Sequence, residues 1–361
     1  MTIAVDRSIE ANATPVLREL IYTICPVLVA SNVALELGWI HDELGRVGAK
    51  PTYLRSALSD VAWPAHYNHD SGRLLRDGGN SPAIWSKADL RPTVLLGLTQ
   101  AQPAGKVLVR TDSDIHRVAD LKGRRFGLYK SQRNEKIDHR RATGEHGILA
   151  VLALHGLDRR DVEIVDIEDA DAHTEAPADT PAGIWAQRRA TRQDELTLEA
   201  RALDAGTIDA IYDYSIGVDI RLTQTGRFRV IEDLDRYPDW TLRIANAPRT
   251  LTVSTEFAKA NRDIVVAWLR ASIRAGRWIN AHPEAAADIF YRTTIYADRD
   301  AIARALRDFD LVPNLSAQNL AGLRLETDFL RAHGYIAGDV DVNEWADSSY
   351  LEEAVTSLRR G

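Results

Sequence analysis

The chain has 361 residues, 45% of them hydrophobic and 27% charged, a composition typical of a globular protein with room for two domains. Its formal net charge of −7 argues against nucleic-acid binding, since nucleic-acid binders usually carry a basic surface. The single cysteine, Cys25, excludes an internal disulfide and a zinc site of several thiolates, but leaves a site of histidines and carboxylates open.

The beginning of the chain lacks the features of a secretory signal. Charged residues interrupt the segment before Cys25, so no continuous apolar region precedes a cleavage site. No stretch approaches the roughly 18 consecutive apolar residues that a membrane-spanning helix needs. We therefore expect a cytoplasmic protein that neither spans nor binds a membrane.

The first predicted elements place Cys25 at a junction. Leu20 to Ile24 is typical of a buried strand, and the helical spacing from Val29 to Gly38 follows it. Pro26 suits the first position of that helix, so Cys25 is predicted at the carboxyl end of a strand and at a helix N-cap. Strand ends bind ligands in open α/β sheets, and a helix N-terminus favours a thiolate. The alternative is a small buried hydrophobe.

Strand-like and helix-like segments alternate up to Ser254, which predicts a mainly parallel α/β fold. The predicted strands are Leu20 to Ile24, Thr52 to Arg55, Val94 to Leu98, Lys106 to Arg110, Arg125 to Leu128, Val162 to Ile167, Ile208 to Tyr212, Arg229 to Ile231 and Thr250 to Val253. The predicted helices include His146 to His155, Glu199 to Ala205, Asp263 to Asn280, Pro283 to Tyr291, Arg299 to Phe309 and Ser316 to His333. The acidic stretch from Asp166 to Pro181 lacks periodicity and is predicted to be an exposed loop.

A second informative segment runs from His66 to Pro82. Ser81 and Pro82 form an N-cap and first-position pair, which predicts a helix to about Ala88. Gly78 and Gly79 just before it let the backbone approach a ligand closely. With Arg76 beside them, the N–H groups of this helix start would bind a small oxyanion, unless the glycines form only a turn.

The spacing His66-x-x-His69-Asp70 would also suit metal ligands on one helical turn. No further His or Glu stands in an obvious frame, so we predict no metal site. Surface or hydrogen-bonded rings are the alternative for both histidines.

Three basic clusters, Arg124-Arg125, His139-Arg140-Arg141 and Arg188-Arg189, are flanked by acidic residues. That pattern favours a solvated surface over phosphate binding.

Two segments, Asp120 to Leu128 and Asp204 to Ile211, resemble sequence segments that recur in the periplasmic solute-binding fold of the nitrate, taurine and sulfonate type. The resemblance implies a type II fold of two α/β lobes joined by two crossovers, near Thr111 to Asp114 and Leu242 to Thr250. Lobe one would comprise residues 1–114 and 241–361, with a helical C-terminal part packed on it. Lobe two would comprise residues 115–240.

At the predicted site the resemblance narrows to one family. Cys25-Pro26 after a strand, His66, Arg76 ten positions later, and Gly78-Gly79 before a Pro-led helix resemble the hydroxybiphenyl sulfinate desulfinase family. The likeness continues through Ala275-Gly276-Arg277-Trp278, Trp345-Ala346 and Tyr350-Leu351.

This family resemblance implies a hydrolase that acts on a carbon–sulfur bond, with no metal and no organic cofactor. Cys25, His66 and Arg76 would be catalytic, and Arg76, Gly78 and Gly79 would bind a small anionic, sulfinate-like substrate. The product would be sulfite. A monomer is expected.

Two roles for Cys25 stay open. The thiol would give its proton to the ring carbon as SO₂ leaves, or the thiolate would attack sulfur. A helix terminus and Arg76 favour the thiolate, whereas a bound anion disfavours it. We favour a neutral thiol that acts as an acid, with His66 orienting it.

The chain departs from the family where an aromatic wall is expected. The family has a Trp at the start of a lobe-two helix, and here the stretch is Gly144-Glu145-His146-Gly147. The segment Lys130 to Thr143 before it is shorter and more charged than in the family. This predicts less stacking surface and a smaller or more polar sulfinate.

Two other classes of function remain as alternatives. The first is a solute-binding protein of an ABC importer, which would bind a small anion without catalysis and would not need Cys25 beside His66. The second is a cytoplasmic ligand sensor, or a related enzyme that cleaves carbon–carbon bonds, such as an aryl decarboxylase.

Overall fold

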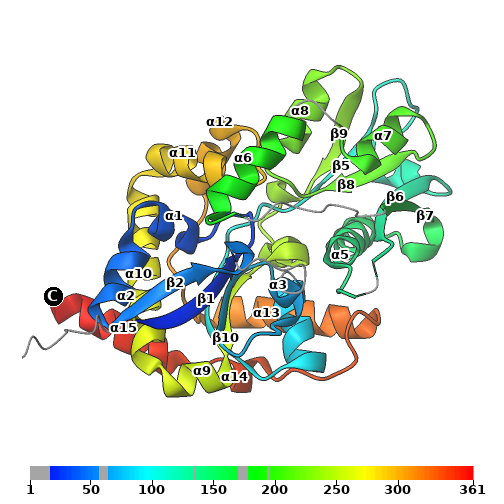
Figure 1. Ribbon diagram of the computed structural model, residues 1–361. Helices are drawn as coiled ribbons and strands as arrows, with labels where there is room; N and C mark the ends of the chain where they lie inside the picture. The colour runs from blue at the N-terminus through cyan, green and yellow to red at the C-terminus, as the bar shows by residue number, and fades with distance from the viewer. Residues whose placement is uncertain (1–16, 57–63, 134, 170–177, 193–195, 361) are drawn as a thin grey trace, which may run out of the picture.

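The structure is a computed structural model that describes residues 17–56, 64–133, 135–169, 178–192 and 196–360. Two lobes, each built around a five-stranded sheet, face each other across a large cavity (Figure 1). The predicted α/β, two-lobe fold is confirmed, but both sheets are mixed and not mainly parallel. Within the described residues, no helix combines the length and apolarity that crossing a bilayer requires.

The sheet of lobe one has the strand order β2-β1-β3-β10-β4. Its strands are β1 (Arg18–Ile24), β2 (Ala49–Tyr53), β3 (Leu74–Gly78), β4 (Thr93–Thr99) and β10 (Arg249–Ser254). β1 is parallel to both neighbours, whereas β10, which returns from lobe two, is antiparallel to β3 and β4. The carboxyl ends of β1 and β3 therefore lie side by side at one edge, where ligands bind in open α/β sheets.

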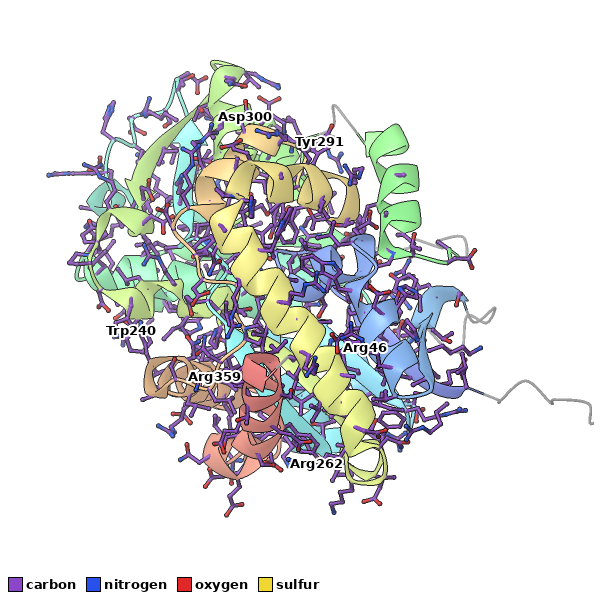
Figure 2. The ribbon with its side chains drawn as sticks, turned by 90° about the vertical axis from the view of Figure 1, so that its left-hand side faces the viewer. Arg46, Trp240, Arg262, Tyr291, Asp300 and Arg359 are labelled. Atoms are coloured by element: carbon purple, nitrogen blue, oxygen red, sulfur yellow. The ribbon has the colours of Figure 1, made fainter. Side chains whose placement is uncertain are left out.

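Helices cover both faces of this sheet. They are α1 (Ala30–Glu36), α2 (Trp39–Arg46), α3 (Ala65–Asn68), α4 (Asn80–Trp85), α9 (Thr255–Ala260), α10 (Arg262–Ala281), α11 (Pro283–Thr293), α12 (Arg299–Leu306), α13 (Ala317–Ala332), α14 (Val342–Trp345) and α15 (Ser348–Arg360). The largest core cluster joins α1, α2, α10 and α15 to one face, and a second joins α4, α13 and α14 to β4. Figure 2 shows α10 running along the molecule from Arg262 toward Tyr291 of α11, between Arg46 of α2 and Arg359 of α15.

Lobe two contains the second sheet, with the order β7-β6-β8-β5-β9. Its strands are β5 (Lys106–Arg110), β6 (Arg125–Ser131), β7 (Glu163–Asp169), β8 (Ala210–Asp213) and β9 (Phe228–Asp233), and its helices are α5 (His139–Leu154), α6 (Pro181–Arg192), α7 (Leu198–Asp204) and α8 (Val218–Gln224). α5 covers one face and α7 with α8 the other. α6 packs back on α11 of lobe one, through the buried Ile184 and Trp185.

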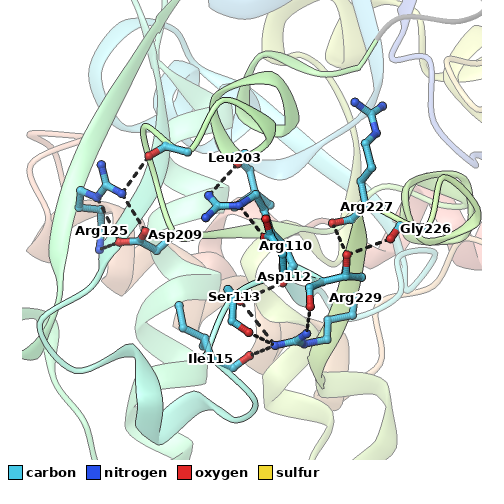
Figure 3. Close-up of polar contacts among 12 residues, drawn as sticks. Arg110, Asp112, Ser113, Ile115, Arg125, Leu203, Asp209, Gly226, Arg227 and Arg229 are labelled. Atoms are coloured by element: carbon cyan, nitrogen blue, oxygen red, sulfur yellow. Dashed lines mark hydrogen bonds and ion pairs between the residues drawn. The ribbon is translucent and has the colours of Figure 1, made fainter.

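The first crossing between the lobes differs from its prediction. β5 pairs with β8 and β9 of the second sheet, so the chain crosses between Thr99 and Lys106, before the predicted Thr111 to Asp114. The predicted place is a turn held inside lobe two: Thr111 N–H donates to Arg227 O at 2.9 Å, and Arg229 Nη2 donates to Ser113 O at 2.8 Å (Figure 3). The chain returns between Asp233 of β9 and Arg249 of β10.

The two segments that carry the solute-binding resemblance are in contact. Arg125 starts β6, and its guanidinium donates two bonds to Asp209, Nη2 to Oδ1 at 2.8 Å and Nε to Oδ2 at 3.1 Å (Figure 3). Nη2 of the same guanidinium donates to Gly206 O at 2.9 Å. Gly206 has φ +70°, so it ends α7 as the sequence predicts for a helix C-terminal glycine.

Half of one predicted segment lies outside the described residues. The exposed loop expected from Asp166 to Pro181 overlaps the end of β7, its middle is not described, and α6 begins at Pro181. α5 begins at His139, seven residues before its predicted start, so the basic cluster there belongs to a helix.

Candidate active site

Cys25 follows β1 directly, as predicted, but no helix begins there. α1 starts at Ala30 with Val29 as its N-cap, and Pro26 is not its first residue. The run of branched residues around Val27 to Val29 favours an extended turn over an immediate helix. Cys25 is 9% exposed, and its N–H donates to Asp77 O at 2.8 Å, which continues the β1–β3 pairing past the strand end.

The side chains of Thr23, His66 and Cys25 form a row within lobe one. His66 lies on α3, and its Nε2 is 3.4 Å from Cys25 Sγ. Its Nδ1 is 2.6 Å from Thr23 Oγ1. Thr23 and Cys25 are two residues apart, so they share one face of β1. The imidazole is therefore fixed from both nitrogens, and no signal in the sequence identified Thr23.

Arg76 comes from β3, a strand that the sequence analysis missed. Thr23 and Arg76 are register partners in the parallel β1–β3 pair. Arg76 is fully buried, and its guanidinium donates to Cys25 Sγ at 3.2 Å, to His66 O at 2.9 Å and to Gly79 O at 2.7 Å. The guanidinium thereby joins the ends of β1, α3 and β3 around the sulfur.

Gly78 is required by the close approach of Cys25. A Cβ at Gly78 would lie 2.3 Å from both Cys25 Cβ and Sγ, and its φ is +157°. Gly79 is the N-cap of α4, which starts at Asn80, so the predicted Ser81–Pro82 cap is wrong. Pro82 is tolerated inside the first turn because the N–H groups there have no helical partner in any case.

The site's electrostatics keep His66 neutral. Burial lowers the pKa of His66 well below its usual range, and the positive charges of Arg76 and Arg55 lower it further. Burial also lowers the pKa of Arg55 to about 10, so that guanidinium remains a cation at neutral pH. A neutral His66 therefore brings no positive charge to the neighbouring sulfur.

These residues line a cavity of about 1110 Å³ between the lobes. Cys25, His66, Arg76 and Gly79 contribute to its wall, so the structure brings together four of the five predicted site residues, with Gly78 behind the sulfur. Aromatic rings from several elements also line it: Tyr53, Tyr67, Tyr129, Trp185, Tyr212, Tyr214, Tyr291 and Tyr296.

The lobe-two wall holds charged residues that the sequence analysis assigned to solvent. Arg140 lines the cavity, with its guanidinium 3.6 Å from the centre of the Tyr129 ring and Nη2 2.9 Å from Glu199 Oε1. Burial raises the pKa of the nearby Asp213 to about 7, and the charge of Glu199 adds to the rise. His139 and Arg140 face the cavity because their helix points its first turn at it, and the Arg140 side chain remains 37% exposed there.

The stretch Gly144 to Gly147 does not line the cavity. It lies within α5, where a Cβ at Gly147 would lie 2.0 Å from the Tyr212 ring, so the helix packs there on β8. His146 stacks on Phe329 of α13 at 4.0 Å. The rings that line the cavity come from other elements, and a smaller stacking surface than in the desulfinase family stays a prediction.

His66 and His69 do not converge. His69 Nε2 is 3.1 Å from Thr252 Oγ1 on β10, whereas His66 faces Cys25 and Thr23. Burial lowers the pKa of His69 to about 3, with Arg76 adding to the effect. The described part of the chain contains no cluster of three His, Cys, Asp or Glu side chains suited to a metal ion.

Comparison with known proteins supports the family resemblance. The 2′-hydroxybiphenyl-2-sulfinate desulfinases of Rhodococcus erythropolis and Rhodococcus qingshengii are 26% identical to this chain over 362 residues, covering 94% of each protein. The crystal structure of the desulfurization enzyme DSZB superimposes with a TM-score of 0.71 at 23% identity, covering 95% of this chain and 100% of that one.

A transport receptor shares the fold. The periplasmic sulfonate-binding protein SsuA of Methylobacillus flagellatus KT superimposes with a TM-score of 0.70 at 18% identity, covering 96% of both chains. The family model described as NMT1/THI5 like matches residues 84–286, which is more than half of the chain. The chain therefore belongs to the NMT1/THI5-like family.

Proposed function

We propose that this protein is a desulfinase-like hydrolase that cleaves the carbon–sulfur bond of an aryl sulfinate and releases sulfite. One observation carries the proposal: Cys25 Sγ lies 3.4 Å from His66 Nε2 and 3.2 Å from Arg76 Nη2 at the wall of a large cavity. A receptor that only binds an anion has no use for a thiol held in this way. The likeness to desulfinases along 94% of the chain supports the same reading.

Arg76 and the N–H of Gly79 would bind the sulfinate. The described contacts of Arg76 use three of the five N–H groups of a guanidinium, which leaves two for the oxygens of an anion. Charge-assisted hydrogen bonds of this type would fix the sulfur and the ring carbon beside Cys25. Arg55 adds a second positive charge at the wall.

In the favoured mechanism the thiol of Cys25 acts as an acid. The Cys25 proton goes to the ring carbon, where the electron pair of the carbon–sulfur bond forms the new carbon–hydrogen bond. SO₂ leaves, and Cys25 remains as a thiolate. Water then adds to SO₂ to give bisulfite, and the proton released restores the thiol. The sum is sulfinate plus water to arene plus bisulfite. The neutral His66 would orient the S–H, and Arg76 would stabilise the transient thiolate.

The nucleophilic alternative uses the same residues. The thiolate would attack sulfur, and the ring carbon would leave and take a proton from water. The resulting hydroxide would then cleave the Cys25 S–SO₂⁻ adduct to bisulfite and regenerate the thiolate. This route needs a thiolate beside a bound anion, and the low pKa of His66 offers no imidazolium to support it. The acid mechanism is therefore preferred.

The test is sulfite release from a panel of aryl and alkyl sulfinates. The unmodified protein should release sulfite from at least one aryl sulfinate, and Cys25→Ser should lose turnover while it still binds the substrate in calorimetry. Carbon dioxide in place of sulfite, from matched aryl carboxylates, would assign a decarboxylase instead. A Cys25→Ser variant with a near-normal rate would refute the role of the thiol.

A second candidate is a sulfonate-binding protein without catalysis. Its support is the fold match to SsuA along 96% of the chain. Tight binding of a sulfonate with no sulfite from any sulfinate would favour it.

We also propose that the protein works in the cytoplasm, and cell fractionation with a tagged full-length chain tests this.

A further inference from the structure

A phenol that no prediction used lies beside the thiol. Tyr296 belongs to the segment between α11 and α12 and is 4% exposed, yet it lines the cavity. The neighbouring Ile295 N–H donates to Pro26 O at 3.1 Å, which ties this segment to the residue after Cys25. The Tyr296 side chain is therefore placed at the Cys25 end of the cavity.

The phenol is held as a hydrogen-bond donor by its surroundings. Burial raises the pKa of Tyr296, so its hydroxyl keeps its proton at neutral pH, while the charge of Arg249 and a hydrogen bond with it oppose the rise. Arg249 is the first residue of β10 and is 2% exposed. A buried guanidinium that contacts the phenol fixes where the hydroxyl points.

Hydrogen bonds connect Arg249 to the crossing between β4 and β5, and through it to lobe two. Its Nη2 donates to Gln102 Oε1, and Gln102 lies in the crossing from β4 to β5. Gln102 Nε2 donates to the backbone O of Tyr214, just after β8 of lobe two. Gln102 is 1% exposed, so the whole link is buried. The position of Tyr296 thus depends on both crossings and on how the lobes meet.

We propose that the Tyr296 hydroxyl is a further substrate-binding group, which donates a hydrogen bond to a sulfinate oxygen, and that Arg249 is a positioning residue that acts through it. The inference rests on the proposed function for the identity of the anion. A neutral phenol adds a donor without adding charge, so it complements the two remaining N–H groups of Arg76. Because Arg249 is linked to lobe two through Gln102, the Tyr296 hydroxyl would be correctly placed only while the two lobes are in contact.

The test is binding of benzenesulfonate, a stable anion with the same kind of oxygens. Calorimetry would compare the unmodified protein with Tyr296→Phe and with Tyr291→Phe, a matched control that also lines the cavity. A lost hydrogen bond to a charged group predicts about tenfold weaker binding for Tyr296→Phe. The control should bind normally. Unchanged affinity in Tyr296→Phe would overturn the proposal.

A double-mutant cycle tests whether Arg249 acts through the phenol. Arg249→Lys should weaken benzenesulfonate binding several-fold in the Tyr296 protein but have no further effect when combined with Tyr296→Phe. Additive losses would assign Arg249 a contact of its own and overturn the positioning role. Thermal unfolding of each variant separates these effects from loss of folded protein.

The outcomes separate this inference from the proposed function. If the unmodified protein releases no sulfite but Tyr296→Phe still weakens sulfonate binding, the phenol contact stands and the desulfinase proposal fails. If sulfite is released normally by Tyr296→Phe and its sulfonate affinity is unchanged, the desulfinase proposal stands and the phenol contact fails.

Discussion

The two ends of the cavity are built from different kinds of support. At the Cys25 end, the positions of Thr23, Cys25 and Arg76 follow from the register of adjacent parallel strands, and Arg76 also donates to two backbone oxygens. At the lobe-two end, Arg140 and Glu199 hold each other, and their side chains are 37% and 19% exposed. The first end is fixed by the backbone, and the second by long side chains that can be rearranged.

This difference suggests a division of labour. A reacting thiol needs partners within a few tenths of an ångström of their working positions, which strand register supplies. Recognition of the rest of a substrate tolerates side chains that adapt. Substitutions at the Cys25 end should therefore reduce kcat, and substitutions at the lobe-two end should change KM. Four predictions test this contrast.

The largest effect is expected from Gly78→Ala. The added methyl would meet Cys25 Cβ and Sγ at 2.3 Å and would disfavour the φ of +157°. Either the end of β3 or the Cys25 side chain must therefore move. We expect loss of turnover by at least about a hundredfold and a destabilisation of about 2 kcal/mol or more. Sulfite assays and urea unfolding measure both.

The matched control for that substitution is Gly72→Ala, where an added Cβ would meet open space. It should change neither rate nor stability. A Gly78→Ala protein with normal kcat would show that the thiol tolerates displacement, and the contrast between the two ends would then be lost.

Next in size is Thr23→Val, which keeps the side-chain shape and removes the hydroxyl that holds His66 Nδ1 at 2.6 Å. With one side of the imidazole released, kcat should fall about tenfold to a hundredfold while KM stays within a factor of about two. Thr23→Ser should restore most of the rate. A change confined to KM would place Thr23 in substrate binding instead.

A smaller effect on turnover is expected at the lobe-two end. Arg140→Met removes the stacking on Tyr129 and the bond to Glu199, so KM should change by about threefold to tenfold, with kcat nearly unchanged. Arg160→Met serves as control, since Arg160 is an exposed lobe-two arginine paired with Asp158. Steady-state kinetics measure both constants. A fall in kcat as large as the change in KM would contradict the proposed division between the two ends of the cavity.

The smallest effect on turnover should come from the contact between the lobes. Burial raises the pKa of Glu326 on α13 to about 7, with its bond to His146 of α5 opposing the rise. The folded protein therefore binds this proton more tightly than the unfolded chain, so the free energy of unfolding falls as pH rises from about 4.5 to 7.

Glu326→Gln should make that fall shallower, by on the order of 1 kcal/mol, with unchanged kcat at neutral pH. Asp77 and Asp213, whose pKa values burial raises to about 6 and about 7, keep part of the slope in the variant. Urea unfolding at pH 5 and pH 8 measures the difference. An identical slope in both proteins would mean that Glu326 does not titrate in this range.

The sequence was most informative where hydrophobic pattern and residue chemistry agree. β5 has its predicted bounds, and the four long C-terminal helices lie within a few residues of theirs, because their apolar periodicity is strong. Cys25, His66, Arg76 and Gly79 do meet at one cavity wall. That expectation came from the family resemblance, since spacing along the chain does not show contact in space.

The missed features depend on tertiary structure. β3 contains only two apolar residues, Leu74 and Leu75, before Arg76 and Asp77, so its burial is not visible in the hydrophobic pattern. The charges of Arg76 are tolerated there because backbone oxygens accept its bonds. Arg140 was assigned to solvent for the opposite reason. A charged helical turn is usually exposed, and only the fold turns this one inward.

The way the chain passes between the lobes has a practical consequence. Lobe two leaves lobe one after Thr99 and rejoins it at Arg249, so it is an insertion between two neighbouring strands, β4 and β10. A homologous segment could be grafted between those points to exchange specificity, while the thiol and its partners stay in the host. Such chimaeras would have to keep Gln102 and Arg249 as a matched pair at the seam.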